Sequence, residues 1–599
     1  MANFDDQLRL AIKALQTGQN LRAEHIAQNL TLTHPKMELC WLLLGAALQP
    51  QHRYSEALVA FTNASGLNDV NADTHYSIAA ILFEMTMYPE AESRCNQAIQ
   101  IQPDHAHTYS MLSKILRVQG RNTEAEKAQN RAIEIALHKI VEMAPNLPGG
   151  HANLGVFQMK NGNLSAAISS YRKALQLDPG DRQVRSNYLF AMARADEISP
   201  AKYLLEAREW ERLEARKPTE GRLDFKLRQR SLWKGRRIRV GYVSGDFRQH
   251  VVSYFFEQVI REHKAESLEL FAYMACKESD ATTSRLRHLI SNWREIQDLS
   301  DDEAVRMIQA DEIDVLIDLS GHTALNRLGI FARRAAPVQA HYLGYFASTG
   351  LSEMDYWIGD AMLVPEGDDV NFSEKVWRLP RLSVSFEGKE DAPSPKWKPQ
   401  ENDQICLGSF NDLSKITDET LNLWAKLLQA LPQAKLLLKT AGLQEERNRE
   451  RVKQRMFELG ISNDRLELYG KNESWEDHMA MYDKLDIALD PVGGQGGATT
   501  TCEALWMGVP VITLAGTKVG QRMTAALAGA LGHLEWIAQN ETEYLEKTIK
   551  LALNVELRTM LRPLQREKMK KSAICDAKSL TESLENAYME MFDRWCSGA

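Results

Sequence analysis

The residues with the clearest chemistry lie in a glycine- and threonine-rich stretch, DPVGGQGGATTTCE, at positions 490–503. Its glycines let the backbone approach a ligand closely, and its threonines place hydroxyls and amides at a predicted helix start, where free N–H groups bind phosphate. Glu503 follows one helical turn later, where a carboxylate can accept both hydroxyls of a ribose. This spacing indicates a nucleoside diphosphate site, although a glycine-rich loop with a threonine N-cap is the simpler alternative. The loop and helix-start residues are Gly493, Gly494, Gly496, Gly497, Thr499, Thr500 and Thr501.

Three further clusters follow predicted strands, where open α/β sheets place their active sites. His250 ends the segment 244–250 and could act as a general base or bind a substrate; capping a helix is an equally good interpretation. Residues 318–327 bring glycine, histidine, hydroxyl and guanidinium groups together. Such a cluster could recognise a polar ligand, or it could be a turn whose polar groups hydrogen-bond to one another. Lys415 ends the segment 409–415 and could neutralise a departing diphosphate. Since no Asp-x-Asp pair lies in a strand-end loop, we expect a metal-independent enzyme without a cofactor.

Length and composition bound the class of protein. A chain of 599 residues is too long to fold around a single hydrophobic core, so we expect about two to four domains. Its 44% hydrophobic and 25% charged residues are ordinary fractions for a globular protein. A net charge of −8 argues against nucleic acid as the main partner. The seven cysteines form no C-x-x-C pair, which indicates a reducing compartment. The acidic N-terminus has no signal-peptide core and the longest apolar run, 40–48, is too short for a bilayer, so we expect a cytoplasmic protein with no membrane partner.

Small residues recur at a fixed spacing in the first third of the chain. Five alanines are separated by three intervals of 34 residues and one of 42: Ala23, Ala57, Ala91, Ala125 and Ala167. This period is typical of the tetratricopeptide repeat, with one eight-residue insertion. Small residues let paired helices approach, and prolines end the second helix of a pair. We therefore predict a solenoid of about five repeats over residues 1–185.

After residue 185 the pattern changes. Residues 186–234 are helical, charged and non-repetitive, and we interpret them as linker and capping helices. Short β-branched runs then alternate with helical segments over 235–390 and 400–599, which predicts two α/β domains with parallel sheets. A polar, proline-bearing connector at 387–404 joins them, and the cleft between two such domains is the natural ligand site. The strands are expected at 238–243, 268–273, 313–319, 339–344, 405–410, 435–439, 466–468, 487–489 and 509–513.

With these motifs together, the chain resembles the O-linked N-acetylglucosamine transferase family, bacterial type, in which tetratricopeptide repeats precede a GT-B glycosyltransferase of two Rossmann-like domains (family 41). The resemblance covers nearly the whole chain. It implies an α plus α/β fold and an inverting enzyme that transfers a sugar, N-acetylglucosamine first of all, from a UDP-sugar to a protein. The matching segments are 241–250, 318–323, 336–339, 343–345, 408–415 and 499–510.

The resemblance also assigns roles to single residues. His250 matches the family's active-site histidine and Lys415 its diphosphate-binding lysine, so these two are the candidate catalytic residues. Glu503 matches the ribose carboxylate, and His478 a residue at the uracil end of the donor. Phosphate contacts are implied for Thr499 and Thr500, and further donor contacts for Asn411, Gly496, Gly497, His322, Leu343 and Gly344.

Two departures from the family pattern concern the donor sugar. Residues 343–349 are LGYFAST where relatives usually have LGYPGT, so Phe346 and Ala347 fill space beside the expected sugar pocket. The loop 492–498 lacks a histidine or an aromatic–asparagine pair that relatives place there. Long repeat arrays of the family carry an asparagine ladder for peptide capture, which we do not expect here because the equivalent positions are Leu43, Ser77, Met111 and Asn153.

The leading hypothesis is a cytoplasmic protein O-glycosyltransferase. A serine or threonine hydroxyl would attack the anomeric carbon of the UDP-sugar while UDP leaves against Lys415 and helix amides, and the repeats would recruit the acceptor protein. One alternative keeps the fold but uses another nucleotide sugar or an asparagine acceptor, as in soluble N-glycosyltransferases and flagellin-modifying enzymes. A remote alternative is a non-catalytic scaffold. A homodimer is also considered, because tetratricopeptide solenoids often self-associate.

Overall fold

The computed structural model of the chain describes residues 4–214, 236–264, 266–389, 391–397, 399 and 404–598. These residues form two compact units, one up to Leu154 and one from Gly155. Part of the predicted linker, 215–234, and positions 390, 398 and 400–403 of the predicted connector lie outside the described residues. No helix in the described part of the chain has the length and apolar content needed to cross a bilayer.

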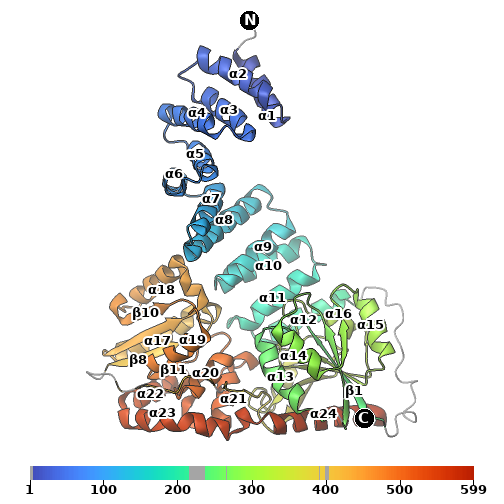
Figure 1. Ribbon diagram of the computed structural model, residues 1–599. Helices are drawn as coiled ribbons and strands as arrows, with labels where there is room; N and C mark the ends of the chain where they lie inside the picture. Colours follow the sequence, from blue (N-terminus) through green and yellow to red (C-terminus); the bar gives the residue numbers. More distant parts are fainter. Residues whose placement is uncertain are drawn as a thin grey trace. The chain divides into compact units, whose positions relative to one another are not determined.

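The first unit consists of helix pairs, blue in Figure 1. They are α1 (Phe4–Gln16), α2 (Asn20–Thr33), α3 (Glu38–Leu48), α4 (Tyr54–Leu67), α5 (Ala72–Glu84), α6 (Tyr88–Ile101), α7 (Ala106–Val118) and α8 (Asn122–Met143). The repeated alanines lie in the second helix of each pair and are at most 1% exposed: Ala23, Ala57, Ala91 and Ala125. Close packing explains the small residues, since a Cβ on Gly45 would lie 2.7 Å from the Phe61 ring. The eight-residue insertion lengthens one helix, because α8 has 22 residues where α2, α4 and α6 have 14.

The second unit begins with the end of the repeat region. Its helices are α9 (Pro148–Lys160), within which the boundary between the units falls, α10 (Leu164–Leu177), α11 (Arg182–Arg194) and α12 (Pro200–Glu214). Ala167 is fully buried in α10, and a Cβ on Gly155 would lie 2.7 Å from the ring of Tyr171. The same close packing therefore recurs in the last repeat. The described part of the predicted linker, 186–214, is helical as expected.

The first α/β domain, green in Figure 1, contains a seven-stranded parallel sheet. Its elements are β1 (Ile238–Ser244), α13 (Val251–Glu262), β2 (Leu268–Met274), α14 (Ala281–Leu289), β3 (Asn292–Glu295), α15 (Asp301–Ala310), β4 (Val315–Asp318), α16 (Leu328–Ala332), β5 (Val338–Tyr342), β6 (Tyr356–Asp360) and β7 (Lys375–Leu379). The strand order is β3-β2-β1-β4-β5-β6-β7. Because the order reverses between β1 and β4, the loops after these two strands border the crevice where such sheets bind ligands.

The second α/β domain, orange in Figure 1, has a six-stranded sheet in the order β10-β9-β8-β11-β12-β13, where β8 is Ile405–Ser409 and β11 is Ile487–Leu489. Its order reverses between β8 and β11, so the loops after those strands border a second crevice. The remaining strands are β9 (Ala434–Lys439), β10 (Leu466–Tyr469), β12 (Val511–Leu514) and β13 (Ile537–Ala538). The helices are α17 (Asp418–Ala430), α18 (Glu446–Glu458), α19 (Trp475–Ala480), α20 (Thr499–Trp506), α21 (Met523–Ala530), α22 (Glu541–Leu553), α23 (Val555–Lys570) and α24 (Ala577–Ser597).

The last helix, α24, returns to the first domain, and in Figure 1 it runs in red beside that domain's sheet. Its apolar face belongs to the same core as β1 and α13. The Tyr242 hydroxyl donates to that of Tyr588 (3.3 Å), and His263 Nδ1 lies 3.0 Å from Glu585 Oε1. The prediction grouped the terminal helices with the second domain, at 400–599. The structure shows that α24, the last of these helices, packs into the core of the first domain.

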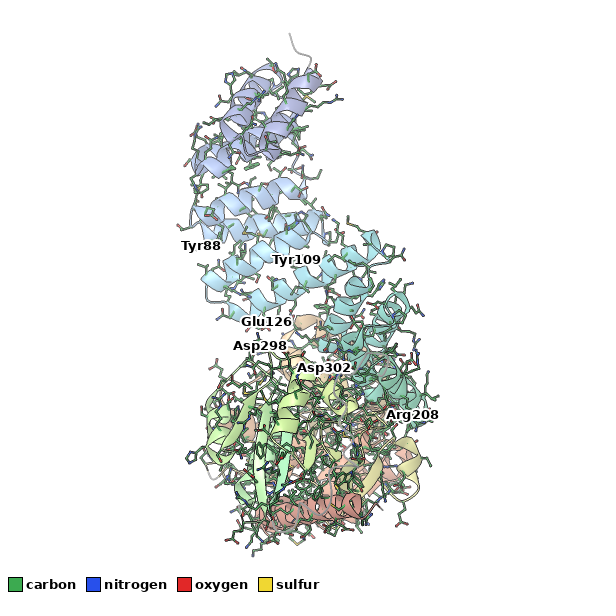
Figure 2. All side chains as sticks on the ribbon, turned by 90° about the vertical axis from the view of Figure 1, so that its right-hand side faces the viewer. Tyr88, Tyr109, Glu126, Arg208, Asp298 and Asp302 are labelled. Carbon is green, nitrogen blue, oxygen red and sulfur yellow. The ribbon has the colours of Figure 1, made fainter. Side chains whose placement is uncertain are left out.

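The helical segment before the sheets is fixed to the first domain. The Tyr203 hydroxyl on α12 hydrogen-bonds to that of Tyr345 (2.9 Å). Arg208, labelled on the same helix in Figure 2, donates from Nε to Ser373 Oγ (3.1 Å). The end of the repeat region is therefore part of the same compact unit as the two sheets.

Candidate functional site

A cleft of about 830 Å³ is lined by both α/β domains and by α9 to α11. Its walls include the loops that follow β1, β4, β8 and β11, which are the four loops at the two strand-order reversals. A cavity of this size suits a ligand as large as a nucleotide sugar. The structure brings these predicted site residues together in its lining: His250, His322, Leu343, Gly344, Asn411, Lys415, Thr499 and Thr500.

Lys415 ends the short 3-10 turn Leu413–Lys415 after β8. Its Nζ donates to the carbonyl of Gly496 (2.8 Å), which ties it to the glycine-rich loop. Burial, and then the nearby Arg194 guanidinium, lower the pKa of Lys415 to about 8. The carboxylates of Asp490 and Asp412 oppose this shift. A charged, poorly solvated lysine in this position can stabilise a departing diphosphate.

The glycine-rich loop is shaped by Asp490. The buried carboxylate accepts from the Gly497 N–H (2.6 Å) and from the Thr513 hydroxyl (2.8 Å). A Cβ on Gly496 would lie 2.8 Å from Asp490 Oδ2, and one on Gly497 would lie 2.4 Å from Thr501 Oγ1. Internal packing therefore requires glycine at 496 and 497. Their contact with a donor stays a prediction.

Among the residues that the structure describes, no side chain caps the amides at the start of helix α20. Its N-cap is Ala498, so the alternative interpretation of a threonine N-cap is wrong. The threonine hydroxyls are engaged elsewhere: Thr500 donates to Asn411 Oδ1 (3.0 Å), and Thr501 pairs with Thr524 (2.9 Å). The first backbone N–H groups of the helix therefore offer the kind of site that phosphate prefers.

Glu503 lies one turn into α20 and is oriented by two neighbours. Its Oε2 accepts from the Tyr482 hydroxyl (3.2 Å) and from His478 Nε2 (3.0 Å). His478 Nδ1 lies 2.5 Å from Lys439 Nζ, which can only donate, so Nδ1 accepts from the lysine and Nε2 donates to Glu503. Within the described part of the chain, Glu503 Oε1 accepts no hydrogen bond. The carboxylate is therefore held in place with one oxygen suited to a ribose.

His250 is confirmed as a helix cap, whereas its role as a general base or substrate ligand stays a prediction. It is the N-cap of α13, with Nδ1 3.3 Å from the Val252 N–H, and its side chain also lines the cleft. Nδ1 lies 3.4 Å from Asp246 Oδ2 as well. The two contacts require different tautomers, because Nδ1 must accept from Val252 but donate to Asp246. Only the tautomer that donates to Asp246 leaves Nε2 able to accept a proton from a substrate.

His322 is almost fully buried beside the cleft, and both ring nitrogens have partners. Nε2 lies 2.8 Å from the Thr349 carbonyl and Nδ1 lies 3.2 Å from Ser186 Oγ on α11. Burial lowers the pKa of His322 to about 4, so the ring is neutral at physiological pH. These contacts join the helical segment to the first domain. A role in donor binding remains a prediction.

The sugar-pocket departures lie together in the cleft. Phe346 and Gln495 both line it, one from each α/β domain. A Cβ on Gly520 would lie 3.3 Å from Gln495 and 3.8 Å from Phe346. The turn before Phe346 is tightly packed, because Leu343 has φ 73° and a Cβ on Gly344 would lie 1.8 Å from the Leu319 carbonyl. The two sequence departures therefore border the same space.

Sequence reasoning missed three polar side chains of this region. Arg194, at the end of α11, lines the cleft, and nothing in its local sequence distinguished it from other charged residues of the linker. Lys439 and Tyr482 orient His478 and Glu503. Lys439 had a usable signal, since it ends a predicted strand at the carboxyl edge of the sheet.

The chain is similar to known proteins in both its repeat region and its α/β domains. The chain matches the model of glycosyl transferase family 41 over residues 218–386 and 397–584, and tetratricopeptide repeat models over 71–137 and 148–181. It is 34% identical over 440 residues to the probable UDP-N-acetylglucosamine–peptide N-acetylglucosaminyltransferase SPINDLY of Solanum lycopersicum, covering 71% of this chain and 46% of that protein. It is 30% identical over 380 residues to the probable UDP-N-acetylglucosamine–peptide N-acetylglucosaminyltransferase SEC of Arabidopsis thaliana, covering 61% of this chain and 38% of that protein.

Among solved structures, a mutant O-GlcNAc transferase of Thermobaculum terrenum has a TM-score of 0.71 at 32% identity, covering 88% of this chain and 98% of that one. The chain spans less than half the length of the curated plant relatives it matches. The chain therefore aligns with the bacterial structure over most of its own length and nearly all of the length of the other.

Proposed function

The chain belongs to glycosyl transferase family 41, and from this premise we propose that it is an inverting protein O-glycosyltransferase that uses a UDP-sugar. The donor sugar in this proposal is N-acetylglucosamine, the sugar in the names of the plant relatives and of the bacterial structure. The observation that carries the proposal is one loop-and-helix unit that joins Lys415, the uncapped start of α20 and the oriented Glu503.

The donor would bind to the second domain along this unit. Glu503 would accept the ribose hydroxyls, and the amides at the start of α20 would bind the diphosphate. A serine or threonine hydroxyl of the acceptor would attack the anomeric carbon from the face opposite to the diphosphate. The bond from that carbon to the phosphate oxygen breaks, and its electron pair stays on UDP, where Lys415 neutralises the added charge. In this proposal Lys415 and the helix amides stabilise the charge on the departing diphosphate, so we expect that neither a metal nor a cofactor is needed.

His250 faces the same cleft from the first domain. In the tautomer that donates to Asp246, its Nε2 could take the proton from the attacking hydroxyl. In the tautomer that accepts from Val252, Nε2 could only donate to the substrates. We propose the first role for the reaction, since it provides the general base.

A second candidate function keeps the fold and the inverting reaction but takes another nucleotide sugar. The specific observation in its favour is that Phe346 and Gln495 lie together beside Gly520 in the lining of the cleft. In this proposal the two side chains narrow the space for the sugar. A pocket that is narrowed by a large aromatic side chain discriminates by shape against substituents of the sugar ring.

The repeats of the first unit would recruit the acceptor protein, because tetratricopeptide solenoids present extended binding surfaces. All seven cysteines are free, and five of them are buried, which supports our proposal of a reducing, cytoplasmic location. Self-association of the repeats into a homodimer belongs to the same proposal.

The testing experiment is thermal unfolding of the full chain with UDP, GDP and CMP and with their sugars, because binding to the native state raises Tm. We expect UDP and UDP-N-acetylglucosamine to raise Tm, and transfer to a protein acceptor that is lost in Lys415→Ala. Stabilisation by a different UDP-sugar, or by the sugar of another base, would support the second candidate. If no nucleotide or nucleotide sugar of the panel raises Tm, both candidate functions are wrong, and a non-catalytic scaffold is favoured.

A further inference from the structure

Arg194 brings a second cation into the cleft from outside the α/β domains. It is the last residue of α11, and its guanidinium carbon lies 4.1 Å from the centre of the Phe190 ring. Nη1 donates to Ser414 Oγ (3.2 Å), directly beside Lys415 in the chain. Nε is buried and has no hydrogen-bond partner among the described residues. A buried guanidinium N–H without an acceptor is costly, which marks it as a candidate ligand contact.

The end of α11 is held against the donor-binding loops of the second domain. A Cβ on Gly494, in the glycine-rich loop, would lie 3.2 Å from the Arg194 carbonyl. Just after Arg194, Lys518 Nζ donates to the Ala195 carbonyl and Gln521 Nε2 donates to Asp196 Oδ1 (2.8 Å). These contacts fix the position of Arg194 relative to the loop that holds Lys415.

Charges of both signs surround Arg194. Burial lowers the pKa of this arginine, and the Asp412 carboxylate opposes that shift. The Arg194 guanidinium in turn lowers the pKa of Lys415, so the two cations lie within electrostatic reach of each other. No ion pair joins Arg194 to a carboxylate within the described part of the chain. Two neighbouring cations repel, and an anion between them relieves that repulsion. A guanidinium also matches phosphate oxygens in geometry, with several N–H donors in one plane.

We propose that Arg194 binds the terminal phosphate of the nucleoside diphosphate. Helix α11 thereby supplies a second cation, in addition to Lys415, that stabilises the leaving group. This inference rests on the proposed function, because it assigns a new residue to the same donor site. It also gives the end of the repeat region a chemical role in donor binding, separate from the recruitment of acceptors.

The test is isothermal titration calorimetry of the full chain with UDP and UMP, which differ by the terminal phosphate, and in parallel with GDP and GMP. The variants are Arg194→Met and Arg194→Gln, since glutamine keeps a donor for Ser414 without the charge. The matched control is Arg212→Met, which removes an exposed cation from α12 that pairs with Glu209. Circular dichroism and Tm establish that each variant is folded.

We expect both Arg194 variants to bind UDP roughly ten- to a hundredfold more weakly, as loss of a charged hydrogen bond predicts, while UMP affinity changes by less than about threefold. Arg212→Met should bind both nucleotides like the wild type. If the Arg194 variants lose affinity for UDP and UMP equally, Arg194 has a structural role only. If UDP affinity is unchanged but sugar transfer is slower, Arg194 acts on the acceptor. Either result overturns the inference. If the wild type binds neither diphosphate, the proposed function fails, and this inference fails with it.

Discussion

Lys415 offers the sharpest test of how the cleft works, because its pKa lies close to the physiological range. Burial and the Arg194 guanidinium lower that pKa to about 8, well below the ordinary 10.5 of lysine. Only the protonated form can neutralise a diphosphate. With a pKa of about 8, the protonated fraction is about 90% at pH 7 and about 3% at pH 9.5. Activity that depends on this charge must therefore fall as pH rises through 8.

The assay is kcat/KM for the UDP-sugar from pH 6 to pH 10, since this parameter reports ionisations of the free enzyme. We expect an alkaline midpoint near pH 8 and a decrease of about thirtyfold between pH 7 and pH 9.5. Lys415→Arg should remove this midpoint, because a guanidinium stays charged above pH 12. Lys415→Ala should lose roughly a hundred- to a thousandfold in kcat at pH 7, the usual cost of removing one donor to a developing anion.

Two results would refute this reasoning. Activity that stays nearly constant up to pH 10 would mean that the ammonium is solvated like a surface lysine. A midpoint that stays near 8 in Lys415→Arg would assign the titration to another group. UDP affinity, measured over the same pH range, separates a binding effect from an effect on the chemical step.

Three further predictions concern other parts of the chain. Glu503→Ala should weaken UDP and UMP equally, by at least about tenfold in calorimetry, because it removes a charged acceptor of the ribose; unchanged affinity would contradict that role. Asp246→Asn should lower kcat at least about tenfold with unchanged UDP affinity, because His250 loses the carboxylate that favours the tautomer with a basic Nε2. A wild-type kcat in this variant would mean that His250 only caps a helix. Gly45→Ala should destabilise the first unit by about 1–3 kcal/mol, because the new methyl meets the Phe61 ring, while turnover of a short peptide stays the same; an unshifted Tm would disprove the tight packing.

Much of the fold could be predicted because its signals are local. The 34-residue spacing of alanines marks the helix pairs, and the longer interval before Ala167 corresponds to the two extra turns of α8. Strands with continuous apolar runs, such as β1 and β11, were also predicted. Strands β6, β7 and β13 were not predicted. Nor was β3, because its residues NWRE lie at the edge of the sheet and show no apolar alternation. Its pairing with β2, a tertiary interaction, defines it as a strand.

The residues of the candidate site likewise fall into those that local sequence motifs reveal and those that only long-range contacts place there. Lys415, the glycines and Glu503 lie in short motifs whose spacing already suggests a nucleotide, so sequence analysis could select them. Arg194 contacts a residue 220 positions away, and Ser186 reaches His322 across 136 positions. Contacts of this kind depend on how the helical segment docks against the sheets. No local pattern in a single sequence encodes them.

The return of α24 to the first domain has a consequence for biosynthesis. The sheet of the first domain is complete when β7 ends at Leu379, whereas the helix that covers its core begins at Ala577, about 200 residues later. At about 5–20 residues per second, a ribosome needs roughly ten to forty seconds to translate that interval. During this time the nascent first domain exposes an apolar surface that its own residues do not cover. We therefore expect this surface to bind a chaperone until the last helix is made and covers it.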